Sequence, residues 1–205
     1  MKKYTLEIVV FICGAVVMAY EIIGSRLLGP YVGTSMFVWT SIIGVILLSL
    51  SLGYMWGGRI ADQKPRADIL SMYIFIAGLF IILSTFVKDL LLDFLLNSID
   101  NVKAVSIIAS LLLFTIPSVL LGMVSPFAAR IKMKSIEKSG STVGNLYAIS
   151  TVGSIIGVFM AGFYFIPTFK VTNILLLLAI VLIATSLYLN GMYRFEIKSS
   201  HENES

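Results

Sequence analysis

Six long apolar stretches dominate the sequence, separated by short polar breaks. A helix needs about 20 mostly apolar residues to cross a hydrocarbon core of about 30 Å, and each stretch is about that long. With 58% hydrophobic and 13% charged residues, a water-soluble domain of this size could not bury so much apolar surface in one core. The sequence therefore predicts an all-α polytopic membrane protein. The predicted spans are Thr5–Leu28, Met36–Trp56, Ile69–Val87, Ala104–Ala128, Thr142–Ile166 and Val171–Asn190.

The first apolar stretch is too long for a removable signal peptide and lacks a small-residue cleavage site. We therefore expect it to be a permanent helix, within one six-helix transmembrane domain over residues 1–192. Residues 193–205 form a polar tail that contains the only histidine, His201. The tail has no apolar pattern that could fold, so we expect it to be disordered.

Lysine and arginine are distributed unevenly between the two sides of these spans. Cations accumulate in cytoplasmic loops because their translocation is unfavourable, so both chain ends are predicted to be cytoplasmic in a multi-pass protein of the cell membrane. The basic residues on the N-terminal side would face the anionic inner leaflet. This distribution explains the net charge of +4 without nucleic acid as a partner. The N-terminal side receives Lys2, Lys3, Arg59, Lys64, Arg66, Arg130, Lys132, Lys134, Lys138, Arg194 and Lys198, and the other side receives Lys88, Lys103 and Lys170.

Between the third and fourth spans, polar side chains recur at helical spacing. Asp89, Asp93, Asn97 and Asp100 lie four, four and three residues apart, and leucines, Phe94 and Ile99 fill the rest of the helix. This pattern predicts an outer amphipathic helix over Lys88–Asn101, lying on the membrane surface. Its acidic face is most simply solvated, and gathering external cations is the alternative.

Two G-x-x-x-G patterns predict places where helices pack closely. Gly53 and Gly57 lie in the second span, and Gly153 and Gly157 lie in the fifth. Without side chains, glycines let the backbones of membrane helices approach each other. The pattern is common in membrane helices, so it indicates a packed interface and no particular function.

The fourth span contains Pro117 and Pro126. Each proline removes a backbone hydrogen bond and predicts a kink or an early helix end. Bent helices are frequent in transporters, although a static kink is the simpler interpretation. Between the two three-helix halves we find only a weak echo, SRLLGP at 25–30 and SVLLGMVSP at 118–126.

Glu21 is the ionisable side chain that most needs an explanation. If the first helix enters the hydrocarbon near Leu6, Glu21 lies about 22 Å further along, in the outer half of the membrane. A lone carboxylate at that depth marks an ion, proton or substrate pathway, or else it is a protonated, hydrogen-bonded structural group. Ser25, one turn away, is a candidate donor to Glu21. Arg26 lies at the outer boundary and is predicted to be an interface anchor.

The segment GGRIADQKPRAD follows the second span and contains the spacing G-x-x-x-D-x-x-x-R. This spacing is similar to the signature loop of the major facilitator superfamily, which also joins the second and third helices on the cytoplasmic side. The resemblance implies a conformational loop formed by Gly58, Arg59, Asp62 and Arg66. Glycine would permit a tight helix approach, and Asp62 would accept from an arginine or a helix N-terminus. The alternative is an ordinary basic loop.

Polar residues also cluster near the cytoplasmic end of the fifth span, in GNLYAIST. Asn145 can bridge helices, which is its simplest role, and Asn145 and Tyr147 are further candidates for contact with a substrate or proton. The sequence has no His or Cys cluster with metal-ligand spacing, no Ser-His pair outside the tail and no paired carboxylates in the spans. Cys13 is the only cysteine, so no intramolecular disulfide can form. We expect no enzymatic activity, no metal and no cofactor.

Three segments carry the elements Tyr-Glu, Ser-Arg-Leu-Leu-Gly, Gly-Gly-Arg and Leu-Tyr-Ala in order: YEIIGSRLLGPYVGTSMFVWTSIIGVILLSLSLGYMWGGRIADQKP, IPSVLLGMVSPFAAR and VGNLYAISTVGSIIGVFMAGFYFIPTF. They resemble the membrane domain of spermidine synthase-like (fused major facilitator/spermidine synthase) proteins. In that family an aminopropyltransferase domain typically follows the membrane part. This chain ends soon after its sixth span and has no G-x-G turn for a nucleotide, so we expect no aminopropyl transfer by this polypeptide.

The resemblance implies half of a major facilitator-like bundle, and full transporters of that kind hold the substrate between two six-helix halves. We therefore expect a homodimer, with a soluble spermidine synthase-like protein as a candidate partner. The favoured function is a transporter of a small cationic solute such as a polyamine, because pairing with Glu21 would offset the desolvation of the cation. The alternative is a membrane anchor or channelling subunit for a separate polyamine enzyme. A channel is not favoured, because no ring-forming polar filter is evident.

Overall fold

The computed structural model describes residues 4–133 and 139–202. These residues are almost wholly helical and contain no strand, and six helices are long and apolar enough to cross a membrane. The predicted all-α polytopic fold is therefore confirmed. In chain order the elements are α1 (Thr5–Val32), α2 (Met36–Gln63), α3 (Ala67–Ser98), α4 (Val102–Gly122), α5 (Val124–Lys132), α6 (Ser139–Phe159), the π-helix η1 (Met160–Phe165), α7 (Ile166–Thr168) and α8 (Val171–Glu202).

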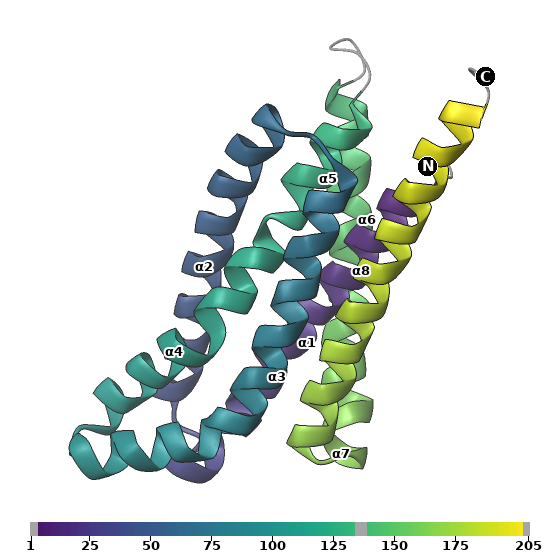
Figure 1. The fold of residues 1–205 in the computed structure, drawn as a ribbon. Helices are drawn as coiled ribbons and strands as arrows, with labels where there is room; N and C mark the ends of the chain where they lie inside the picture. Colours follow the sequence, from purple (N-terminus) through teal and green to yellow (C-terminus); the bar gives the residue numbers. More distant parts are fainter. Residues whose placement is uncertain (1–3, 134–138, 203–205) are drawn as a thin grey trace.

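Both ends of the chain lie on the same side of the bundle (Figure 1). We call this the terminal side, and the opposite side, where α7 lies, the far side. The turn between α2 and α3 belongs to the terminal side, and the turns after α1 and α3 belong to the far side. An even number of spans requires this arrangement of the two ends.

Two of the predicted boundaries are wrong. Residues 88–98 are helical, but they form the last third of α3 and not a separate amphipathic helix. No glycine or proline interrupts the chain there, so the helix of the third span simply continues. Likewise α8 runs on to Glu202, so the backbone of the polar tail is helical as far as that residue. The tail contains no helix-breaking residue after Gly191, which explains why the helix continues past the apolar stretch.

The six spans pack as two equivalent groups of three. α1 packs mainly along α6, α2 along α4, and α3 along α8, while α3 also contacts α4 and α1 also contacts α8. In chain order, each of the first three spans (α1, α2, α3) has a counterpart among the last three (α4–α5, α6–α7, α8). When every span is replaced by its counterpart, the same pairs of spans remain in contact. Because consecutive spans reverse direction, this replacement inverts the group across the membrane. The bundle therefore has the contact pattern of an inverted repeat, as many transporter folds do.

Glycines let the backbones of the two repeats approach each other closely. Gly53 and Gly57 of α2 lie against the junction of α4 and α5, and a Cβ on Gly53 would lie 2.3 Å from the carbonyl oxygen of Val119. Gly153 and Gly157 of α6 lie against α1, where a Cβ on either would lie 2.1 Å from a backbone oxygen. No side chain fits at such distances, so backbone meets backbone. Since α2 and α6 are equivalent, each G-x-x-x-G holds the first span of the other repeat.

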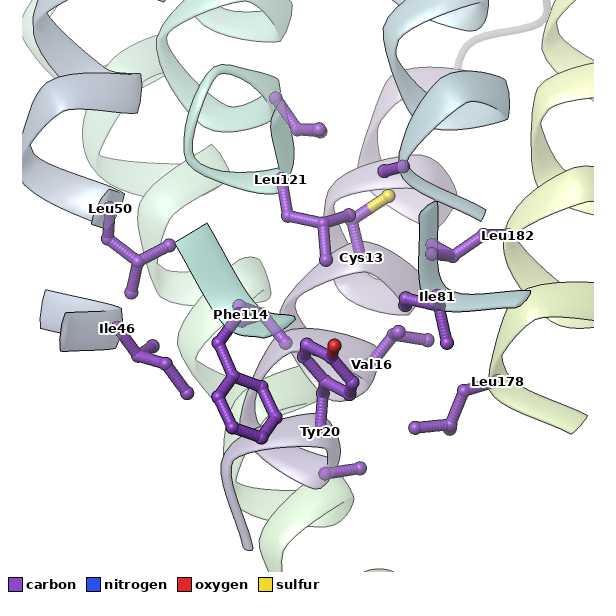
Figure 2. Close-up of a cluster of buried hydrophobic side chains, with 14 of the residues drawn as sticks. Cys13, Val16, Tyr20, Ile46, Leu50, Ile81, Phe114, Leu121, Leu178 and Leu182 are labelled. Carbon is purple, nitrogen blue, oxygen red and sulfur yellow. The ribbon is translucent and has the colours of Figure 1, made fainter. Parts of the chain in front are cut away.

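Two hydrogen bonds to the carbonyl of Leu113 connect three helices in the apolar centre of the bundle. Pro117 has no N–H to donate to the carbonyl of Leu113, one turn earlier. Instead the Tyr20 hydroxyl donates to that oxygen at 3.0 Å and the Ser84 hydroxyl at 3.1 Å. The rings of Tyr20 and Phe114 pack edge to face, with centroids 5.0 Å apart (Figure 2). The hydrogen bond that proline removes from α4 is thus replaced by hydroxyls of α1 and α3.

Candidate functional site

Glu21 lies in the half of α1 nearer the far side, and its side chain is almost buried, with 9% of the residue exposed. Within the described part of the chain, its carboxylate has no hydrogen-bond or ion-pair partner. Burying a carboxylate without a partner costs stability. The fold alone therefore gives no reason for an acidic residue at this position.

Helical geometry shows which face of α1 carries Glu21. Gly14, seven residues earlier and at nearly the same angle, lies against Ser150 of α6. Gly24, one turn later, lies against Phe114 of α4 and also contacts α2. Glu21 therefore lies on the face of α1 between its contact with α6 and its contacts with α2 and α4.

The two polar neighbours of Glu21 in sequence have other roles. The hydroxyl of Ser25 donates to the carbonyl oxygen of Ile22 at 2.8 Å. A serine hydroxyl has a single proton to donate, so the predicted hydrogen bond from Ser25 to Glu21 is wrong. Arg26 is exposed at the far-side end of α1 and forms no ion pair with any described residue. This is the placement that an interface anchor requires.

The other two candidates for substrate contact lie far from Glu21. α1 and α6 run parallel, with Gly153 beside Phe11. Glu21 lies ten residues from that contact toward the far side, and Asn145 lies eight residues from it toward the terminal side. At 1.5 Å per residue, the two are about 27 Å apart along the bundle. Asn145 and Tyr147 are exposed on the surface of α6, so within one chain the four residues do not form one site.

The predicted conformational loop is mostly helix. Gly58, Arg59 and Asp62 lie in the last turns of α2, and a Cβ on Gly58 would meet nothing within 4 Å. The tight helix approach assigned to Gly58 is therefore wrong, and Gly57 makes that approach instead. Asp62 does have an arginine partner, because its Oδ1 lies 2.9 Å from Nε of Arg130 in α5 and the two side chains form an ion pair.

Arg66 does not join that pair. Its guanidinium donates to both carboxylate oxygens of Asp68, at 3.1 and 2.6 Å, and this carboxylate raises the pKa of Arg66. Arg59 is exposed. Of the four residues assigned to the loop, Asp62 alone connects two spans of the described bundle.

Glu7 is a structural partner that the sequence interpretation missed. It is buried at the start of α1, and its Oε1 accepts from Nζ of Lys132 at the end of α5. Its other oxygen is buried and has no partner among the described residues. A signal was available, because Glu7, Gly14 and Glu21 recur every seven residues and so share one face of α1.

The α6 span loses its regular geometry at the level of Glu21. Gly157 lies beside Ala15. Six residues further along, α1 reaches Glu21 and the α6 span reaches the π-helix η1. The N–H of Ile166 donates to the carbonyl five residues earlier, just before Pro167. π-Helical turns inside α-helices are frequent at functional sites. Glu21 and η1 therefore lie at the same depth in the bundle, where one span carries a buried carboxylate and the other departs from α-helical geometry.

The fold and this site define a class: a six-span α-helical membrane protein, built as an inverted repeat, whose first span holds a buried carboxylate with no partner among residues 4–133 and 139–202. Comparison with protein-family models, curated proteins and solved structures finds no match to the chain. The resemblance to the membrane domain of spermidine synthase-like proteins therefore stays a prediction. Within residues 4–133 and 139–202, no group of three or more His, Cys, Asp or Glu side chains could hold a metal ion.

Proposed function

We propose that this chain is one half of a transporter for a small organic cation, and that two copies pair so that Glu21 of each lines a shared path. The observation that carries the proposal is the buried Glu21 carboxylate without a partner among the described residues. Ionisable residues at this depth are costly and are typical of ion, proton and substrate pathways. A bound ammonium group or proton would supply the missing partner.

The substrate class follows from the chemistry of this carboxylate. An organic cation entering an apolar bundle loses hydration, and pairing with Glu21 offsets part of that cost. The methylene groups of such a cation would lie against apolar side chains of the bundle, where their burial is favourable. A polyamine combines positive charge with methylene chains, and it is also the substrate that the family resemblance implies.

The surface of α6 supports pairing of two copies. In its apolar window only 17% of the residues are buried, against 39 to 61% for the other five spans. Lipid-facing surface is ordinarily apolar, whereas interfaces between membrane helices are enriched in small and polar residues. Exposed small and polar residues occur along both α6 and its equivalent, α2: Asn145, Ala148 and Thr151 on α6, and Thr40, Gly44 and Ser51 on α2.

A second copy that covers α2 and α6 would complete the site. Glu21 lies on the face of α1 between these two helices, so the partner would close over it from outside. The cation would then lie between two halves, as substrates do in transporters built from repeats. Asn145 and Tyr147 would lie at the entrance on the terminal side of that path.

Two ion pairs on the terminal side suit a role in holding one access state. Lys132 pairs with Glu7 of α1, and Arg130 pairs with Asp62 of α2. Both cations belong to the short helix α5, which packs against α1, α2 and α6. An opening of the bundle on this side would have to separate α5 from these acidic partners.

Uptake of labelled spermidine and putrescine into proteoliposomes tests the proposal, with and without an imposed pH gradient. We expect uptake by the natural protein and a loss of at least about 100-fold in Glu21→Gln, which keeps the shape but not the charge. The matched control is Asp93→Asn, which removes an exposed acidic group near the far-side end of α3 and should leave uptake unchanged.

Absence of uptake by the natural protein, in vesicles shown to contain folded and correctly oriented material, would refute polyamine transport. That outcome would favour the membrane anchor for a separate enzyme. Equal uptake by the natural protein and Glu21→Gln would leave transport in place and remove Glu21 from its path.

A further inference from the structure

An apolar groove of about 230 Å³ lies between α1, the α6–η1 segment and α8. It is open on one side, and its walls present no polar atoms. Such a groove in a membrane span is not a water site, because water needs polar partners. Its position in the chain shows that it lies at hydrocarbon depth, where acyl chains are available to fill it. Among the lining residues are Ile12, Ala15 and Ala19 of α1, Met160 of η1, and Leu177 and Val181 of α8.

Two cations flank the far-side end of this groove. Arg26 follows the lining residue Ala19 by seven residues on α1, and Lys170 precedes the lining residue Leu177 by seven residues at the start of α8. Lys170 immediately precedes α8 and is joined to its first turn, since its carbonyl accepts from the N–H of Ile174. Seven residues are nearly two full turns, so each cation lies on the groove face of its helix, about 10 Å nearer the far side.

Both cations are available to a ligand. Arg26 and Lys170 are exposed, and neither forms an ion pair with another residue in the described ranges. Other basic residues do have such partners: Arg66 pairs with Asp68, and Lys132 pairs with Glu7. The far-side end of the apolar groove therefore carries positive charge that no acidic side chain in the described ranges neutralises.

We propose that the groove and these two cations form a binding site for one phospholipid with an anionic headgroup. An acyl chain would lie in the groove along α1 and α8, and the phosphate would accept hydrogen bonds from Arg26 and Lys170. Arginine suits this role because its planar guanidinium can bind two phosphate oxygens at once. The apolar walls and the two cations together favour an anionic lipid, because one such molecule supplies both an acyl chain for the groove and a phosphate for the cations. The site lies between α1, the α6–η1 segment and α8, and Glu21 is not among its lining residues.

Native mass spectrometry tests the site directly. The purified protein is mixed with equal amounts of phosphatidylglycerol and phosphatidylcholine, and the lipids that remain bound after release from detergent are counted. We expect one phosphatidylglycerol per chain, retained in preference to phosphatidylcholine. Removing the cations by Arg26→Gln and Lys170→Gln should lower that preference by about fivefold for each substitution.

Lys103→Gln is the matched control, because Lys103 is also an exposed far-side lysine but lies over the ring of Phe37. It should leave the preference unchanged. Ala19→Phe fills the groove and should reduce retention of both lipids. Equal retention of the two lipids by the natural protein, or an equal effect of Lys103→Gln, would overturn the proposal. If Ala19→Phe does not fold, the exposed cation variants still decide the matter.

Discussion

The two inverted repeats follow the same packing plan but differ in chemistry. In both, the middle span carries a G-x-x-x-G that holds the first span of the other repeat. The first repeat, α1 to α3, contains unbroken helices and all the acidic residues of the described spans up to Phe195. The second repeat has no acidic residue in 102–133 or 139–195, and its helices are interrupted at Met123 and at η1.

This difference indicates a division of roles. The first repeat supplies the carboxylates, namely Glu7, Glu21 and Asp62, and the second supplies the cations of α5 and the irregular backbone opposite Glu21. Complementary charge therefore connects the repeats on the terminal side, while glycine contacts connect them within the membrane. Each connection can be tested by substitution.

The largest effect is expected at the buried ion pair. Lys132→Met leaves the Glu7 carboxylate buried without its cation and should lower the free energy of unfolding by about 3 kcal/mol, measured by titration with sodium dodecyl sulfate. The matched control is Arg130→Met, whose pair with Asp62 is exposed and should contribute less than about 1 kcal/mol. Equal losses in the two variants would show that burial of the Glu7 pair does not matter.

A smaller and symmetric effect is expected at the glycine contacts. Gly53→Ala and Gly157→Ala place a Cβ within 2.3 and 2.1 Å of a backbone oxygen, so each should lower the free energy of unfolding by about 2 kcal/mol. Gly144→Ala meets nothing within 4 Å and should be neutral or slightly stabilising, since alanine favours helix. Destabilisation by one of the two contact variants alone would break the equivalence of the repeats.

The smallest effect is expected at the hydrogen bonds to the Leu113 carbonyl. Tyr20→Phe removes one of the two hydroxyls that bind the Leu113 carbonyl and should cost about 1 kcal/mol of unfolding free energy. In a Pro117→Ala background the cost should fall, because alanine, unlike proline, has an N–H that can donate to the same oxygen. A cost that stays the same in both backgrounds would mean that Tyr20 stabilises the bundle through its ring packing on Phe114 alone.

The spans and their glycine contacts follow from local pattern, and so they could be predicted. Apolar length indicates a membrane helix, and G-x-x-x-G indicates a close crossing, without knowledge of the partner helix. The ends of α3 and α8 could not be placed by hydropathy, because a helix ends at a breaker and not where its apolar surface ends.

Partners distant in sequence were beyond the reach of these patterns. Glu7 and Lys132 are 125 residues apart. For Asp62 the sequence shows no more than that an arginine or a helix N-terminus could be its partner. The inverted repeat was also hidden, since membrane packing constrains residue size more than identity and leaves only the echo around Ser25 and Ser118. For Glu21 the sequence shows that a carboxylate lies at an unfavourable depth, and the structure adds that this carboxylate has no partner within the described part of the chain.

In our proposal, Glu21 is present for function and contributes nothing to the stability of the fold. The most direct test is the free energy of unfolding of Glu21→Met, a substitution of similar volume that removes the buried charge. We expect a free energy of unfolding that is unchanged or higher by about 1 kcal/mol, because a functional residue can be kept at a cost in stability. A loss of about 2 kcal/mol or more would contradict it, because the carboxyl group would then be a hydrogen-bonded part of the fold.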